Sequence, residues 1–133
     1  MGTRSTIALE FADGTVEQVY CHWDGYLQHN GKILAKHYID PFEVKALVSL
    51  GGFSSLKETF GETADEAYTQ RGEELCVNKY ATVAEYFAEC QQEEYDYILR
   101  PVNGKATWFV RFYDTRSWVT LEEAFLMTME CEE

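Results

Sequence analysis

The sequence predicts a single α+β domain that spans residues 1–133. Two pairs of strand-like segments are each joined by a glycine-containing turn, and several other segments carry apolar residues at helical spacing. Hydrophobic residues make up 46% of the chain and aromatic residues 15%, which is enough for a core despite a net charge of -12. We therefore expect one antiparallel sheet built from two β-hairpins, with about four helices packed mainly on one face.

The first hairpin is predicted over residues 5–11 and 15–23. Asp13-Gly14 joins the two strands, because this dipeptide accepts the positive φ angles of a tight turn. With these two residues as the loop, one face of the hairpin is apolar, and we expect it to be the core face. It carries the following side chains: Ile7, Leu9, Phe11, Val16 and Tyr20. The same register sets Glu10 opposite Glu17, a pair of like charges.

Two helices are predicted after this hairpin. Residues 32–38 carry their apolar side chains on one stripe. The next helix begins at Asp40, which can cap free amides, and Pro41 follows at a position that suits its fixed φ angle. Gly51-Gly52 ends this helix. Residues 53–80 have no clear period and are predicted to be a loop with one short strand near residues 67–69.

The second half of the chain carries further helix-start and hairpin signals. Capping boxes mark two further helices, one at Thr82 with Glu85 and one at Thr120 with Glu123. Between them, residues 94–100 and 105–114 flank Asn103-Gly104, the strongest hairpin signal in the sequence. In that register Asp96 lies opposite Arg111, and a pair of opposite charges supports the alignment.

Charge and cysteine content restrict the classes of partner and the compartment. The chain has 11 lysines and arginines against 23 aspartates and glutamates, so we expect neither direct nucleic-acid binding nor attraction to an anionic membrane. No apolar run reaches the roughly 20 residues of a membrane span. The four cysteines form no CxxC pair, so the sequence has neither a zinc knuckle nor a redox motif, and we expect a reduced, cytoplasmic protein. We expect no cofactor.

The densest group of polar and aromatic residues is the segment Tyr20-Cys21-His22-Trp23-Asp24-Gly25-Tyr26, where a strand enters a turn. A carboxylate beside an imidazole can orient a general base, so Asp24 and His22 are candidates for a catalytic pair, with His29 or His37 as additional metal ligands. The alternative is structural: Asp24 caps a helix and a partly buried His22 holds the turn. No catalytic set is complete in the sequence.

Two further features suit binding. Gly31-Lys32 opens a helix, and the free amides of its first turn, together with the Lys32 cation, can hold a phosphate while Trp23 or Tyr26 stacks on a base. The alternative is that these residues form an ordinary turn before a helix. Acidic residues can also form a surface that imitates the charge spacing of a nucleic acid, or they are solvated helix ends. This acidic surface comprises Glu73, Glu74, Glu93, Glu94 and Asp96.

Three segments carry a resemblance to a known group. They are residues 3–8, the hairpin that ends in residues 20–26, and residues 31–34. Together they resemble an uncharacterised family of small proteins from tailed bacteriophages and bacterial genomes, over roughly residues 3–56. Many relatives have proline where this chain has Leu27. The resemblance implies a phage context, with the host cell cytoplasm as the location, and implies no mechanism.

These observations lead to one main functional expectation and two alternatives. The main expectation is a phage-type acidic accessory protein that binds, and inhibits, a host defence or nucleic-acid-handling protein with a basic surface. The first alternative is a protein that sequesters a nucleotide signal. The second is a hydrolase that depends on His22, Asp24 and His29. The predicted binding residues are His22, Trp23, Asp24, Tyr26, His29 and Lys32.

Overall fold

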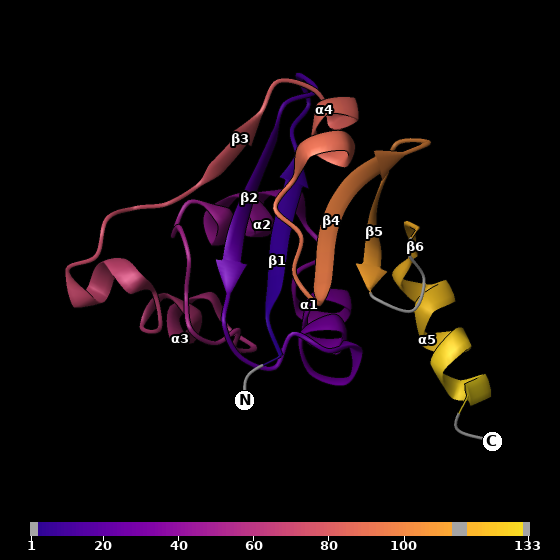
Figure 1. Cartoon of the computed structure of the whole chain (residues 1–133), viewed down its shortest axis with the longest axis horizontal. Helices are drawn as coiled ribbons and strands as arrows, with labels where there is room; N and C mark the ends of the chain where they lie inside the picture. The colour runs from indigo at the N-terminus through magenta and orange to yellow at the C-terminus, as the bar shows by residue number, and fades with distance from the viewer. Residues whose placement is uncertain (1–2, 113–116, 132–133) are drawn as a thin grey trace.

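A computed structural model describes residues 3–112 and 117–131 of the chain. Six strands form one sheet in the order β3-β2-β1-β4-β5-β6. Figure 1 shows β1 and β4 side by side in the middle of this sheet. The strands are β1 (Ser5–Glu10), β2 (Val16–Cys21), β3 (Asn78–Tyr80), β4 (Tyr95–Val102), β5 (Lys105–Phe112) and β6 (Val119–Thr120).

The sheet is mixed, so the predicted purely antiparallel sheet is wrong. β1 pairs with β4 in parallel, while every other pairing between the named strands is antiparallel. Two parallel strands need a crossover of a dozen or more residues. Residues 11–94 connect these two strands: β2 runs back to the end of the sheet at which β1 starts, and residues 22–94 leave the sheet there and re-enter it at the same end as β4.

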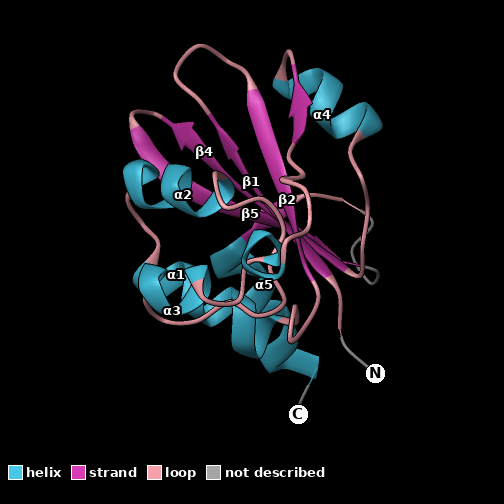
Figure 2. Ribbon diagram, turned by 90° about the vertical axis from the view of Figure 1, so that its left-hand side faces the viewer, coloured by secondary structure: helices cyan, strands magenta, loops and turns pink. Residues whose placement is uncertain are grey.

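The helices lie on both faces of the sheet, unequally divided. Figure 2 shows α1, α2, α3 and α5 gathered on one side, and α4 away from them at the other. The helices are α1 (Lys32–His37), α2 (Pro41–Val48), α3 (Phe60–Ala64), α4 (Val83–Glu89) and α5 (Leu121–Cys131). The predicted arrangement, with helices mainly on one face, is confirmed for all of these except α4.

Two apolar cores follow from this division. The larger core lies under α1, α2 and α5 and receives Ile7 and Leu9 from β1. The smaller core lies on the opposite face, which we call the outer face, where Ala8 and Ile98 meet Tyr86 of α4. Since successive side chains of a strand point to opposite faces, each central strand contributes to both cores.

The register of the first hairpin differs from the predicted one by one residue. Ile7 lies opposite Val19, and Glu10 lies opposite Val16 and not opposite Glu17. The loop has three residues and not two: Gly14, at φ +89°, donates its N–H to the Phe11 carbonyl at 2.9 Å. This bulged turn is common in three-residue hairpin loops. As a result, Val19 and Cys21 enter the larger core, while Val16 and Tyr20 turn to the outer face.

The second hairpin confirms its prediction. Asn103 and Gly104 both have positive φ, at 52° and 79°, as a two-residue type I′ turn requires. Asp96 lies opposite Arg111 as expected. The predicted end of the second strand, residues 113–114, lies outside the described residues.

The predicted helix starts are also confirmed. The Asp40 carboxylate accepts the Phe42 N–H at 2.9 Å, and the hydroxyls of Thr82 and Thr120 each accept an N–H at 3.1 Å from the residue three positions on. The segment 53–80 is more ordered than predicted: it holds α3, β3 and a 3₁₀ turn at Tyr68–Arg71. The predicted strand near residues 67–69 is wrong, because only Ala67 forms a β-bridge, to Phe53.

Candidate functional site

The segment from His22 to Tyr26 follows β2, and backbone hydrogen bonds hold its start and its end. The Trp23 N–H donates to the Ser54 carbonyl at 2.9 Å, and the Gly25 N–H donates to the Thr3 carbonyl at 2.8 Å. The Gly25 carbonyl accepts a hydrogen bond from the buried Tyr97 hydroxyl at 2.6 Å. The turn is therefore tied to the residue segment that leads into β1, to β4 and to the segment after α2.

Gly25 has a steric role in this turn. A Cβ atom at this position would lie 2.6 Å from the Ser5 Cβ atom and 2.9 Å from the Thr3 carbonyl oxygen. Both contacts are closer than van der Waals radii permit, so only glycine allows the turn to lie directly on β1. This explains the glycine of the motif without any ligand.

The aromatic side chains of the turn face solvent. Trp23 is 43% exposed and Tyr26 is 38% exposed, and the rings of His22 and Trp23 are perpendicular, with 4.7 Å between their centroids. We call His22, Trp23 and Tyr26 the aromatic rim. Because its backbone is held in place, the rim presents two large rings at a fixed position on the surface.

His22 does not pair with Asp24. The Nδ1 atom of His22 is hydrogen-bonded to the Tyr20 hydroxyl at 2.8 Å, and no hydrogen bond joins His22 to Asp24 in the part of the chain that the structure describes. The alternation of the strand places Tyr20 and His22 on one side. Asp24 has a left-handed backbone, at φ 57°, which breaks the alternation. The expected catalytic pair is therefore not formed.

His29 and Lys32 line a shallow hollow on α1, away from His22. His29 bonds its Nδ1 atom to the Asn30 side chain at 2.9 Å, and His37 pairs with Glu58 at 3.1 Å. The hollow has a volume of about 330 Å³ and also contains Lys36. Within residues 3–112 and 117–131, no three His, Cys, Asp or Glu side chains gather as metal ligands, so the expected set with His22 is not assembled.

The amides at Gly31 and Lys32 are not free to bind phosphate. The Gly31 N–H donates to the Tyr26 carbonyl at 3.4 Å, and the Lys32 N–H donates to the carbonyls of Leu27 and His29. A π-helical turn over Leu27–Gly31 runs directly into α1, so Lys32 is not in a first helical turn with unpaired donors. The expected phosphate site lacks its backbone ligands.

The acidic residues are only partly a surface. Glu73, Glu74 and Glu94 are exposed and Glu93 is half-buried, but Asp96 is fully buried. The prediction that Asp96 belongs to an acidic surface is therefore wrong. The pleat of β4 turns its carboxylate to the outer face, where the loop before β4 covers it.

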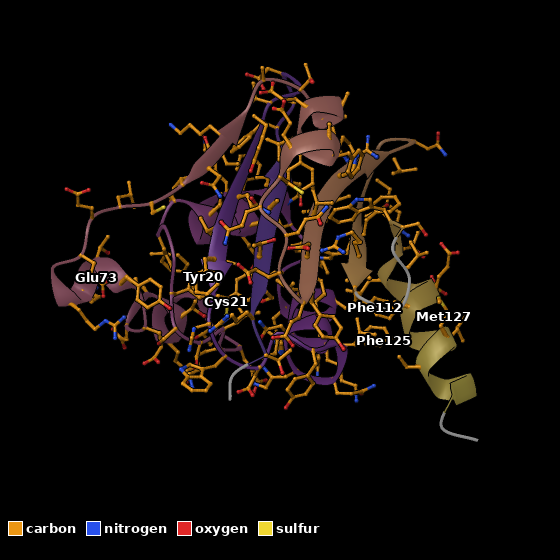
Figure 3. All side chains as sticks on the ribbon, in the orientation of Figure 1. Tyr20, Cys21, Glu73, Phe112, Phe125 and Met127 are labelled. Atoms are coloured by element: carbon orange, nitrogen blue, oxygen red, sulfur yellow. The ribbon has the colours of Figure 1, made fainter. Side chains whose placement is uncertain are left out.

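Tyr20 and Cys21 lie at the end of β2, and Glu73 lies farther out on the same side of the molecule (Figure 3).

Sequence reasoning missed a cavity of about 390 Å³ beside the aromatic rim. Tyr20, which contacts His22, lines this cavity together with Arg4, Tyr68 and Asn78. One signal in the sequence points to it: Gln18 interrupts an otherwise apolar or aromatic series on its face of β2 and is fully buried. A buried amide needs hydrogen-bond partners, which predicts polar neighbours on that face.

Comparison with protein-family models, with curated proteins and with solved structures finds no match to the chain. We therefore classify the protein by its fold, which is an α+β domain with a mixed six-stranded sheet and helices on both faces of the sheet. No helix within the described ranges combines the length and the apolar character that crossing a membrane requires.

Proposed function

We propose that this protein acts by binding another protein through the aromatic rim. The observation that carries this proposal is Trp23, which is 43% exposed although the backbone on both of its sides is hydrogen-bonded to neighbouring segments. Large rings normally stay exposed only where something binds them or where chance leaves a single one. Here Tyr26 accompanies Trp23 within the same turn.

The chemistry of the rim suits a protein partner. Tryptophan and tyrosine are enriched among the residues that dominate binding free energy, because each buries a large area for few rotatable bonds. A side chain on a backbone that is already held in place binds without the entropic cost of ordering a loop. The fixed backbone around Trp23 and Gly25 therefore favours affinity.

The charge of the chain indicates the kind of partner. With a net charge of -12, the protein attracts a basic surface over distance and repels an acidic one. The exposed carboxylates Glu73, Glu74 and Glu94 add to this field. We therefore propose a partner with a basic surface, in line with a nucleic-acid-handling or defence protein of a bacterial host. The phage context implied by the resemblance of residues 3–56 makes inhibition the effect of binding.

Site-specific photo-crosslinking in bacterial lysate tests the proposal. A crosslinking amino acid replaces Tyr26 in one variant and Phe42 in a control variant. Phe42 lies in the first turn of α2 and is 81% exposed, so it is the more accessible of the two positions. We expect a basic protein to be captured at position 26 and not at position 42.

The captured partner is then purified and its affinity is measured. Trp23→Ala should weaken binding by about 2 kcal/mol or more, roughly 30-fold, as expected for a central aromatic residue, whereas Phe42→Ala should leave affinity unchanged. Higher salt should slow association. Identical capture at both positions, or no loss of affinity in Trp23→Ala, would contradict the proposal.

A further inference from the structure

The outer face of the sheet is covered over only part of its area. α4 packs on Val16, Ala8 and Ile98, and these side chains are buried there. Nearer to the start of β1, the outer face bears the cavity of about 390 Å³. Its walls come from β2, from the segment Tyr68 to Asn78, and from the loop that follows α4. Cavities of this size accept small molecules.

The floor of the cavity is held in place by hydrogen bonds. The Gln18 Nε2 atom donates to the Thr6 hydroxyl and to the Gln91 carbonyl, both at 2.9 Å. The Gln18 Oε1 atom accepts from the Tyr80 hydroxyl at 3.0 Å and from Asn78 at 3.3 Å. All the hydrogen-bonding positions of this amide are in use, so it cannot turn aside when a ligand enters. A preorganised floor lowers the cost of binding.

One wall of the cavity is aromatic. The rings of Tyr20 and Tyr68 are nearly parallel, with centroids 6.5 Å apart and planes at 25°. Gly52 leaves room for the Tyr68 ring, because a Cβ atom at position 52 would lie 2.9 Å from that ring. Both phenols are protonated at neutral pH, as tyrosines ordinarily are, and burial raises their pKa further. This wall suits a planar ring.

Two opposite charges line the same cavity without pairing with each other. Among the described residues, the Arg4 guanidinium forms no ion pair. Glu93 uses its Oε2 atom to accept from Gln91 at 2.8 Å, and its Oε1 atom has no protein donor within the described ranges. A ligand that complements both groups carries an anionic and a cationic group.

We infer that this cavity binds a free aromatic α-amino acid. Its carboxylate pairs with Arg4, its ammonium group pairs with Glu93, and its side-chain ring lies against Tyr68 and Tyr20. A nucleotide satisfies Arg4 but brings phosphate charge close to Glu93, in a protein whose net charge is already -12. A zwitterion has no net charge to be repelled. This inference does not depend on the aromatic rim or on a protein partner.

Calorimetric titration of the full chain with four compounds tests the inference. The compounds are L-tryptophan, tryptamine, which lacks the carboxylate, indole-3-propionate, which lacks the ammonium group, and adenosine monophosphate. We expect L-tryptophan to bind, and the other three to bind about tenfold more weakly or worse, because each loses or opposes a charge-assisted hydrogen bond. Equal binding of either single-charge analogue, tighter binding of the nucleotide, or no binding of L-tryptophan at millimolar concentration would overturn the inference.

Two variants assign the charges, and a third is the control. Arg4→Ala should weaken the binding of L-tryptophan about tenfold or more and leave the binding of tryptamine unchanged. Glu93→Gln should weaken the binding of L-tryptophan and of tryptamine, and should leave the binding of indole-3-propionate unchanged. Lys45→Ala removes an exposed cation from α2 and should change nothing. Arg4 is exposed, so its loss should not unfold the protein, and denaturant unfolding verifies this. Equal effects of Arg4→Ala and Lys45→Ala would contradict the assigned contact.

Discussion

The guanidinium of Arg111 donates to the carboxylate of Asp96 across β4 and β5, and this carboxylate has no exposed surface. Its other oxygen accepts the Thr6 hydroxyl at 2.6 Å, and the Glu93 N–H also donates to it, at 3.1 Å. The charge pair is thus part of a polar layer between β1, β4 and β5. Burial still raises the pKa of Asp96, against the lowering effect of these hydrogen bonds.

Asp96→Ala should destabilise the protein by about 3–5 kcal/mol, because the substitution leaves the Arg111 cation buried without a counter-charge. Urea unfolding followed by circular dichroism measures this loss. Glu73→Ala is the control: it breaks the exposed pair of Arg71 and Glu73, whose N···O distance is 3.0 Å, and should cost less than about 1 kcal/mol. Similar losses for both variants would show that the Asp96 pair is not buried in solution.

The thiol of Cys21 should resist alkylation in the folded protein. Burial raises its pKa from 9.0 to about 11, although the Asn30 side chain donates to its sulfur at 3.4 Å. The reactive thiolate is therefore scarce at pH 8, whereas the Cys76 side chain is exposed. Iodoacetamide labelling followed by peptide mass spectrometry should find Cys76 modified and Cys21 unmodified. Equal labelling of the two in the native state would contradict this.

The same pKa shift predicts how stability changes at alkaline pH. The folded state holds the Cys21 proton more tightly than the unfolded chain does, so this stabilising contribution is complete below pH 9 and is lost as the pH rises to about 11. Cys21→Ala should therefore lose less stability between pH 9 and 11 than the natural chain. Denaturant midpoints measured across this range provide the comparison. Parallel pH profiles would argue against the raised pKa.

Gly25→Ala should destabilise the protein by about 1–3 kcal/mol, because its Cβ atom overlaps Ser5 and the Thr3 carbonyl. The displaced turn should also change the fluorescence of Trp23. Gly61→Ala is the matched control: Gly61 lies in α3 with open space around it, so alanine should stabilise by about 0.5–1 kcal/mol through helix propensity. Thermal unfolding distinguishes the opposite signs.

Thr120→Ala should cost about 1 kcal/mol, because the Thr120 hydroxyl accepts the Glu123 N–H at the start of α5. In return, the Thr120 hydroxyl donates to the Glu123 carboxylate at 2.8 Å and the Thr120 N–H donates to it at 3.2 Å, and these two hydrogen bonds lower the pKa of Glu123. Thr107→Ala serves as control, because this exposed hydroxyl of β5 donates to the nearby Lys105 carbonyl and caps no helix. If urea unfolding shows that Thr107→Ala lowers the free energy of unfolding more than Thr120→Ala does, the capping role of Thr120 is contradicted.

Much of the local structure was predictable because short-range chemistry decides it. Asn103 and Gly104 accept positive φ angles, so they determine both the turn and the pairing of Asp96 with Arg111. The side chains of Asp40 and Thr82 bind backbone amides within their own helix turns. Each of these interactions joins residues that are close in sequence or joined by a tight turn, so no distant segment is needed to form them.

The first hairpin shows where local reasoning stops. Asp13 and Gly14 permit a two-residue and a three-residue loop, and the two registers differ in which face carries Val16 and Val19. The structure adopts the three-residue loop, which buries Val19 with Ile7 and places Val16 under α4. The choice depends on what covers each face, and the covering elements come from residues far along the chain.

By itself, the sequence determined the turn at Asn103-Gly104, the starts of α2, α4 and α5, the acidic charge and the presence of an aromatic segment at residues 20–26. Tertiary structure decided the parallel pairing of β1 with β4, the register of the first hairpin, the burial of Asp96 and the cavity beside Tyr20. The physical reason is separation along the chain. Thr6 and Asp96 are 90 positions apart, so only the folded sheet brings them within 2.6 Å.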